Sequence, residues 1–183
     1  MNTRMGSNKS FIEVEGERLI DRTVRILKGI FTEVMIVTNS PLEYLDLGVQ
    51  IVTDIFKGKG SLGGIYTGLF HASSDLSFVT ACDMPYLNSS FIEYMVKMAG
   101  KYDIVTPAMT EGPQPLHAVY SRRCLPNIKN LMDQNKLKIT GFYKGMDVLS
   151  ISPETIRLFD PEGRMFFNVN SPDDLKRIIR KEF

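Results

Sequence analysis

The segment from Arg18 to Asn39, RLIDRTVRILKGIFTEVMIVTN, contains the pattern on which the fold prediction rests. Its first half repeats apolar residues at helical spacing and reaches a glycine near its end, which predicts an amphipathic helix. Its second half, Val34–Asn39, is a short apolar run rich in β-branched residues, which is typical of a buried strand. A helix that leads into a buried strand is the repeating unit of an α/β protein.

The alternation continues along the rest of the chain. Further strands are predicted at 49–54, 76–82, 103–109, 116–121, 148–152 and 166–170. Further helices are predicted after the glycine-rich connector KGKGSLGG, at 89–99 and 126–134, and from Ser171 onward. Strands that alternate with helices indicate a Rossmann-like α/β fold, a mostly parallel sheet with helices on both faces. With no internal repeat or linker, we expect residues 1–183 to form a single domain.

Composition excludes several classes of protein. A chain of 183 residues is long enough for one sizeable domain. Its net charge of +1 provides no broad cationic surface, so we expect no nucleic acid partner. No apolar run approaches the roughly 20 residues that span a bilayer, and no signal peptide is evident, so we expect a cytoplasmic protein without a membrane partner. The two cysteines are expected to be reduced, and two histidines cannot build a histidine-rich metal site.

Three predicted strands end in polar residues. These ends are Thr38–Asn39, Thr53–Asp54 and Cys82–Asp83. Ligands of open parallel sheets bind beyond the carboxyl ends of the strands, so we expect these residues to share one rim. Asp83 is a candidate ligand for Mg²⁺, which one or two carboxylates often bind together with substrate phosphates. The alternative for either Asp is a turn or capping residue; it stays fully open for Asp54.

Other candidates lie outside these strand ends. In NTRMGSNK, Gly6 would let the backbone approach a phosphate, and Arg4 and Lys9 would supply positive charge; the alternative is a solvated basic tail. The glycine-rich segment 58–64 could lie against a nucleotide base or simply form a turn. His117 alternates with apolar neighbours on a predicted strand, so we expect it to be packed rather than catalytic.

Five segments, taken together and in order, resemble the molybdenum cofactor guanylyltransferases, the molybdopterin-guanine dinucleotide biosynthesis protein A family. They are RMGSNKSFIEVEGERLIDRTV, GKGSLGGIYTGL, FVTACDMPYL, GPQPLHAVYSR and FFNVNSPDDL. The resemblance implies the fold of nucleotide-diphospho-sugar transferases. The family's loop begins with Leu-Ala-Gly-Gly on a central first strand, and this sequence contains only the second half of that loop. We therefore expect the first strand to be missing and its neighbours to keep unpaired edges.

The resemblance implies a nucleotidyltransferase that moves GMP from GTP to molybdopterin and releases pyrophosphate. Asp83 would bind Mg²⁺, with Mn²⁺ as an alternative ion. Arg4 and Lys9 would hold the β- and γ-phosphates and, with Asp83, form the catalytic set. The family resemblance assigns GTP contacts to Arg4, Gly6, Lys9, Asn39, Asp54 and Asp83.

On the acceptor side, the resemblance implies that Lys138, Asn168 and Asn170 bind molybdopterin. Asn168 and Asn170 lie two apart on a predicted strand and would project to one face. The acceptor phosphate is already anionic, so no strong general base is required. The family also implies hand-over of the product to molybdoenzymes or their chaperones.

Three alternatives remain open. The first is cytidylyl transfer to molybdopterin, and the second is guanylyl transfer to another phosphorylated metabolite. The third is a catalytically silent module that binds a nucleotide or a partner. A phosphate-loop ATPase is excluded because Gly-x-x-x-x-Gly-Lys-[Ser/Thr] occurs nowhere in the sequence.

Overall fold

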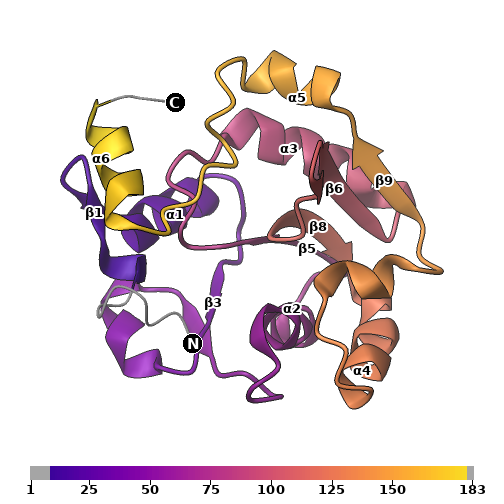
Figure 1. Ribbon diagram of the computed structural model, residues 1–183. Helices are drawn as coiled ribbons and strands as arrows, with labels where there is room; N and C mark the ends of the chain where they lie inside the picture. The colour runs from indigo at the N-terminus through magenta and orange to yellow at the C-terminus, as the bar shows by residue number, and fades with distance from the viewer. Residues whose placement is uncertain (1–8, 181–183) are drawn as a thin grey trace.

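The computed structural model describes residues 9–180 and confirms an α/β fold in which strands and helices alternate (Figure 1). The α-helices are α1 (Leu19–Lys28), α2 (Gly60–His71), α3 (Ser89–Met98), α4 (Leu125–Asp133), α5 (Pro153–Phe159) and α6 (Pro172–Arg180). Short 3₁₀ helices are η1 (Lys9–Phe11), η2 (Pro41–Leu47), η3 (Ala99–Lys101), η4 (Arg122–Cys124) and η5 (Ile139–Tyr143). In this part of the chain, no helix has both the length and the apolar character needed to cross a membrane.

The main sheet contains β5 (Leu76–Thr80), β8 (His117–Ser121), β6 (Ile104–Met109) and β7 (Gly112–Pro113) in that order, and β9 (Val148–Ile151) pairs with β6. Strand β8 is antiparallel to both β5 and β6, whereas β9 is parallel to β6. Strands β5, β6 and β9 therefore share one direction, and β8 opposes them. The sheet is therefore mixed, and three of these four strands run in the same direction.

Two smaller sheets lie beside the main one. Strands β3 (Met35–Val37) and β4 (Gln50–Val52) form a parallel pair. Strands β1 (Glu13–Val14) and β2 (Glu17–Arg18) form an antiparallel hairpin whose turn residues, Glu15 and Gly16, both have positive φ. That conformation matches the right-handed twist of a hairpin. Within residues 9–180, β3 and β5 each keep one edge without a strand partner.

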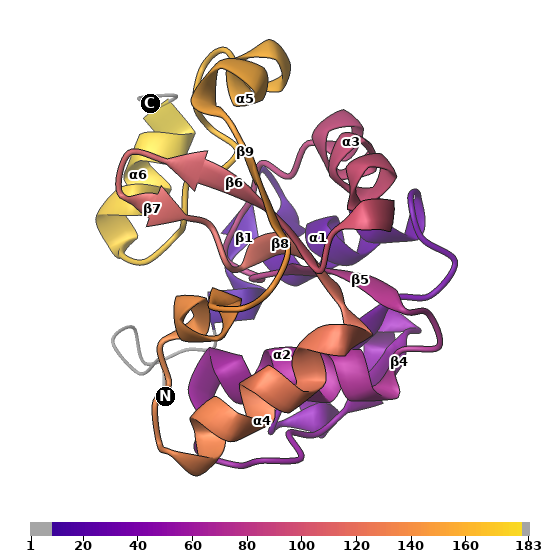
Figure 2. The ribbon, with the colours of Figure 1, turned by 90° about the vertical axis from the view of Figure 1, so that its right-hand side faces the viewer.

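Helices cover both faces of the main sheet. Figure 2 shows α2 and α4 on one side of the strands and α3 and α5 on the other. Leu62, Ile65 and Leu69 of α2 pack with Ile128 and Met132 of α4 in one buried cluster. The opposite face buries a second cluster, which includes Phe91, Met95, Val105, Val119 and Ile156. This two-sided burial explains why the strands are apolar on both faces.

Two local predictions need correction. The segment 166–170 is not a strand: within residues 9–180, one backbone hydrogen bond joins it to the end of β5, from the Val169 amide to the Asp83 carbonyl, at 2.8 Å. The glycine-rich connector is shorter than predicted, because α2 already begins at Gly60. The N-cap of α3 is Asn88, whose side chain accepts a hydrogen bond from the Phe91 amide at 3.0 Å.

The start of α6 confirms a prediction. Ser171 Oγ accepts a hydrogen bond from the Asp174 amide at 3.2 Å, and the Asp174 carboxylate accepts one from the Ser171 amide at 2.8 Å. This reciprocal pair satisfies amide groups that a helix start leaves without partners. It holds the end of segment 166–170, which precedes α6, in place beside the rim.

Candidate functional site

Asp83 lies three residues beyond the carboxyl end of β5, at the rim where the sequence predicts it. One carboxylate oxygen, Oδ1, is buried and has no hydrogen-bond partner among the described residues. Burial raises the pKa of Asp83, and the nearby positive charge of Lys9 opposes that shift. A buried carboxylate oxygen without a partner is costly unless something compensates for it. A cation at this position would compensate it.

Lys9 reaches the same place from η1. Its ammonium donates a hydrogen bond to Asn170 Oδ1 at 3.0 Å and lies close enough to Asp83 to influence its pKa. The neighbouring residue, Ser10, contacts Cys82 Sγ at 3.1 Å and accepts a hydrogen bond from the Tyr44 hydroxyl at 3.1 Å. These contacts hold η1 against the end of β5. The structure therefore brings Lys9, Asp83 and Asn170 together from three distant parts of the chain.

Asn39 and Asp54 form a second part of the rim. They follow the parallel strands β3 and β4, whose last residues pair with each other. Asn39 Nδ2 donates to Asp54 Oδ2 at 2.7 Å, whereas Asp54 Oδ1 is buried without a partner among residues 9–180. The amide of Ile55 donates to Thr67 Oγ1 at 3.0 Å, which fixes the turn that carries Asp54. One carboxylate oxygen thus remains available to a hydrogen-bond donor.

The glycines beside this pair allow close packing. A Cβ atom on Gly63 would lie 3.1 Å from the Phe56 carbonyl oxygen, so the helix start and the preceding turn approach each other too closely for a larger residue. A Cβ atom on Gly64 would lie 3.9 Å from Asp54 Oδ1. The first turn of α2 therefore lies directly beside the Asp54 carboxylate.

A cavity of about 620 Å³ opens beside Asp83. Its rim end is lined by Thr38, Asp83, Gln114 and Asn168, and its deeper part by apolar side chains. We call it the central slot; its walls are β3, β5 and the facing sides of α1 and α2. Its volume lies within the range of ordinary small-molecule sites.

The remaining predicted residues have different outcomes. Asn168 donates to the Phe166 carbonyl at 3.2 Å and lines the central slot, but Asn168 and Asn170 do not share a strand face, because segment 166–170 forms no strand. Lys138 precedes η5 and is exposed, and no contact within residues 9–180 joins it to the other candidates. Arg4 and Gly6 lie outside the described residues.

His117 is packed, as the sequence predicts. It is fully buried, and its ring lies among Phe78, Phe91 and Phe166 at centroid distances of 5.1, 5.9 and 5.2 Å. Burial lowers the pKa of His117 to about 3, so the ring is neutral at physiological pH. A neutral ring enclosed by aromatic side chains cannot serve as a general base at the rim. Both cysteines are free thiols, as expected.

Sequence reasoning missed residues that shape the rim. Ser10 and Tyr44 hold η1 in place, and no local pattern in the sequence signals their meeting. Gln114 lines the central slot, and its backbone is fixed by bonds to Pro107 and Thr106 at 3.1 and 3.3 Å. The prolines on either side of it, in GPQP, were the available signal, because they restrict its backbone.

The donor set fits a cation that takes most of its ligands from a substrate. No cluster of three or more histidine, cysteine or acidic side chains occurs in the part of the chain that the structure describes. Such a cluster would be required for a metal site built by the protein alone. Asp83 supplies one buried oxygen, which matches the pattern of Mg²⁺ bound by few carboxylates together with phosphate oxygens.

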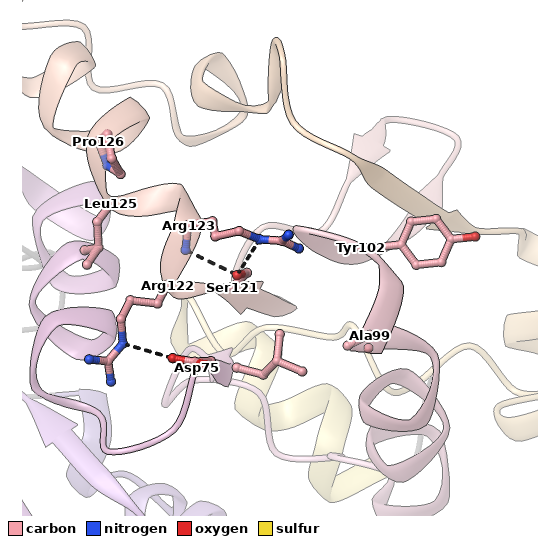
Figure 3. Close-up of a pocket in the computed structure, with 10 residues that line it drawn as sticks. Asp75, Ala99, Tyr102, Ser121, Arg122, Arg123, Leu125 and Pro126 are labelled. Atoms are coloured by element: carbon pink, nitrogen blue, oxygen red, sulfur yellow. Dashed lines mark hydrogen bonds and ion pairs between the residues drawn. The ribbon is translucent and has the colours of Figure 1, made fainter.

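A second cavity, of about 690 Å³, lies at the opposite end of β5 (Figure 3). Two arginines line it, but carboxylates already engage both. Arg122 is 3.7 Å from Asp75, and Arg123 is 2.7 Å from Asp103. These pairs leave little positive charge for a phosphate, so we place the candidate site at the rim.

Known proteins resemble this chain over most of its length. A molybdenum cofactor guanylyltransferase of Desulfosudis oleivorans is 36% identical over 173 residues, covering 94% of this chain and 86% of the relative. One of Syntrophotalea carbinolica is 31% identical over 180 residues, covering 97% and 86%.

Solved structures show the same fold. The molybdopterin-guanine dinucleotide biosynthesis protein A of Archaeoglobus fulgidus superimposes with a TM-score of 0.84 at 28% identity, covering 100% of this chain and 95% of that one. A cytidylyltransferase of Thermus thermophilus, with a TM-score of 0.72 at 14% identity over 94% and 93% of the two chains, shares the fold. The family model described as "MobA-like NTP transferase domain" matches residues 1–146. The chain belongs to this family of nucleotidyltransferases.

Proposed function

We propose that this protein transfers GMP from GTP to molybdopterin, forming the guanine dinucleotide cofactor and releasing pyrophosphate. The observation that carries the proposal is the joining of Lys9, Asp83 and Asn170 at one rim, beside the Asn39–Asp54 pair. Family membership supports the class of reaction, and the names of the relatives support the substrates. The rim supplies the charges that such a reaction needs.

In the proposed reaction, a phosphate oxygen of molybdopterin attacks the α-phosphorus of GTP. The new P–O bond forms as the bond to the β-phosphate oxygen breaks, and pyrophosphate leaves. The attacking phosphate is already anionic, so no side chain has to remove a proton, in agreement with the neutral, buried state of His117. Positioning of the phosphates and neutralisation of their charge then account for the catalysis.

Lys9 and Asp83 would help to neutralise the negative charges of the GTP phosphates. Asp83 would hold a divalent cation, Mg²⁺ in our proposal with Mn²⁺ as the alternative, and the cation would neutralise the phosphate oxygens when bound. The Lys9 ammonium would contact the β- and γ-phosphates, and its bond to Asn170 holds it at the rim beforehand. Arg4 and Gly6, outside the described residues, would complete the contacts to the phosphates.

Asp54 would select the base. Guanine presents two neighbouring donors, N1–H and N2–H, and the unpartnered Oδ1 of Asp54 can accept from one of them. Asn39 holds the other oxygen, Oδ2, and so fixes the orientation of the carboxylate. Adenine and cytosine present an acceptor nitrogen where guanine presents N1–H, so both would be disfavoured.

The molybdopterin side is assigned to segment 166–170 and to Lys138. Asn168 lines the central slot, and Asn170 lies beside Lys9, so both can reach an acceptor held opposite the GTP phosphates. Lys138, which is exposed, would attract the acceptor's phosphate. The finished cofactor would be handed to molybdoenzymes or their chaperones, and we propose that the reaction takes place in the cytoplasm.

A transfer assay tests this function. GTP labelled at the α-phosphate is incubated with Mg²⁺ and freshly released molybdopterin, and the labelled dinucleotide product is separated by chromatography. We expect label in the dinucleotide, and a loss of roughly 100-fold or more in the Asp83→Asn variant. Asp75→Asn, at the amino end of the same strand and 93% exposed, is the matched control and should retain activity. Full activity of Asp83→Asn would refute the assignment of Asp83.

A further inference from the structure

Gln114 presents an unused polar side chain at the rim. It lines the rim end of the central slot together with Asp83 and Asn168. The residue is half-buried, and no hydrogen bond within residues 9–180 engages its side-chain amide, whereas its backbone is bonded. A carboxamide offers an acceptor oxygen and a donor nitrogen. Both groups are therefore available to a ligand that lies beside Asp83.

The backbone of Gln114 is held firmly. Its amide donates to the Pro107 carbonyl at 3.1 Å, and its carbonyl accepts from the Thr106 hydroxyl at 3.3 Å and from the His117 amide at 3.1 Å. Thr106 and His117 are both fully buried. The prolines on either side of Gln114 restrict the turn further. The side chain therefore extends from a fixed point on the rim.

Two tyrosine hydroxyls hold the residue that follows Gln114. Tyr120 donates a hydrogen bond to the Pro115 carbonyl at 2.7 Å, and its oxygen lies 2.8 Å from the Tyr143 hydroxyl. Because Tyr120 gives its proton to Pro115, Tyr143 is the donor to Tyr120. Tyr143 is the last residue of η5, which begins directly after Lys138. The tyrosine pair thus joins the Gln114 turn to the segment that carries Lys138.

The strand order places Gln114 on the acceptor side of Asp83. Gln114 precedes β8, which pairs with β5, and Asp83 lies near the carboxyl end of β5. Asn39 and Asp54, to which we assign the guanine, follow β3 and β4, which form a separate sheet. Figure 1 shows β3 set apart from β5 and β8. A nucleotide held by that pair would approach Asp83 from the β3 side and leave Gln114 to the acceptor.

On the basis of the proposed function, we propose that Gln114 recognises the pterin ring of the acceptor. The ring carbonyl oxygen of a pterin is a hydrogen-bond acceptor, and the adjacent ring N–H is a donor. A carboxamide can engage both at once, because its nitrogen donates to the oxygen and its oxygen accepts from the N–H. The fixed backbone of Gln114 lowers the entropic cost of this contact. Gln114 would thus select the heterocycle, whereas Lys138 would attract the phosphate.

Binding of a pterin phosphate tests the proposal without the transfer reaction. Hydroxymethylpterin phosphate is titrated into the protein, and binding is followed by the fluorescence of the pterin. We expect saturable binding by the parent chain and at least about tenfold weaker binding by Gln114→Met, which keeps the length of the side chain and removes its polar groups. Benzyl phosphate has a ring without hydrogen-bonding groups. In calorimetric titrations, its affinities for the two proteins should agree within about twofold.

Matched variants complete the test. Gln50→Met is the control, because Gln50 is exposed at the amino end of β4, away from the rim, and this variant should bind the pterin phosphate like the parent chain. The affinity for GTP should stay within about twofold in both variants. Circular dichroism verifies that each variant is folded. If methionine disturbs the turn, Gln114→Ser is the second variant, since turns accept serine readily, and the same loss is expected.

Three results would overturn the proposal. The first is equal affinity of Gln114→Met and the parent chain for the pterin phosphate. The second is an equal loss of affinity for pterin phosphate and benzyl phosphate, which would show a structural role. The third is no saturable binding of the pterin phosphate by the parent chain.

Failure of the proposed function would look different. Pterin phosphate binding that depends on Gln114, with no labelled dinucleotide in the transfer assay, would refute the transfer reaction and support the role of Gln114. Labelled dinucleotide with an unchanged KM for molybdopterin in Gln114→Met would support the transfer reaction and refute the role of Gln114.

Discussion

The buried ring of His117 makes the stability of this protein depend on pH in a way that can be calculated. Both ring nitrogens are buried and lack a hydrogen-bond partner among the described residues, and burial lowers the pKa of the ring to about 3. In the unfolded chain, a histidine has a pKa of about 6.5. Because the folded-state pKa is the lower one, the unfolded chain takes up the proton first as the pH falls. The free energy of unfolding therefore decreases below about pH 6.5.

The size of the decrease follows from the two pKa values. A pH of 5 is about 1.5 units below the pKa of the histidine in the unfolded chain, so that histidine is protonated, whereas the ring in the folded protein is still neutral. Each unit corresponds to about 1.4 kcal/mol, so His117 alone should lower the free energy of unfolding by about 2 kcal/mol between pH 8 and pH 5. The decrease continues until the pH reaches the folded-state value of about 3.

Replacement of the ring isolates this effect. His117→Phe keeps an aromatic ring among Phe78, Phe91 and Phe166 and removes the titrating nitrogens. Urea denaturation followed by circular dichroism at pH 8 and pH 5 gives the free energy of unfolding of each protein. We expect the parent chain to lose about 2 kcal/mol more than the variant. At pH 8, the variant should be more stable by about 1 kcal/mol, because two unpartnered polar atoms are removed.

Carboxylates also titrate in this range, but they are common to both proteins and cancel in the comparison. His71→Gln, which removes the exposed histidine of α2, controls for the loss of a histidine elsewhere. An equal pH response in His117→Phe and the parent chain would refute the reasoning, since it would mean that the His117 ring is not held neutral by the fold.

Three further predictions concern the rim and the N-cap of α3. Asn170→Ala should raise the KM for molybdopterin in the transfer assay, and it should weaken GTP binding by a smaller factor, because Lys9 loses the bond that holds it at the rim. Asp54→Asn should reduce the preference for GTP over CTP in calorimetric titrations by about tenfold, because an amide can donate as well as accept. Asn88→Ala should lower the free energy of unfolding by about 1 kcal/mol in urea denaturation, because the cap bond to the Phe91 amide is lost.

Matched variants sharpen these tests. Asn130→Ala, exposed on α4, is the control for Asn170, and equal losses in GTP binding and molybdopterin use by Asn170→Ala would show a structural role. Asp133→Asn, exposed on α4, is the control for Asp54→Asn. If Asp54→Asn keeps the preference for GTP over CTP, the assignment of Asp54 is wrong. Ser89→Ala is the control for the cap, because the structure assigns the N-cap to Asn88; a larger loss at Ser89 would contradict that assignment.

Much of the fold could be predicted because short stretches of the sequence determine its helices and strands. The helical spacing before Gly29 and the β-branched run after it correspond to α1 and β3, and the Ser171 cap corresponds to the start of α6. Segment 166–170 was predicted wrongly because its apolar, asparagine-containing pattern is typical of a strand. An extended segment becomes a strand only when its backbone forms hydrogen bonds with the edge of a neighbouring strand. No such edge is available beside it in the described residues.

The candidate site was predictable where a strand end fixes the residue. Asp83 and Asp54 lie within three residues of the carboxyl ends of β5 and β4, so their place at the rim follows from the topology. The bond between Lys9 and Asn170 joins residues 161 positions apart, and no local pattern encodes it. The position of Lys138 depends on how α4 and η5 pack, which is tertiary information that a spacing rule does not contain.

The central claim is that this rim is a guanine nucleotide site, and a calorimetric titration tests it most directly. The protein is titrated with Mg–GTP and, separately, with Mg–CTP under the same conditions. We predict saturable binding of GTP with one nucleotide per chain, and at least about tenfold weaker binding of CTP. Equal affinity for the two nucleotides, or no binding of GTP, would contradict it.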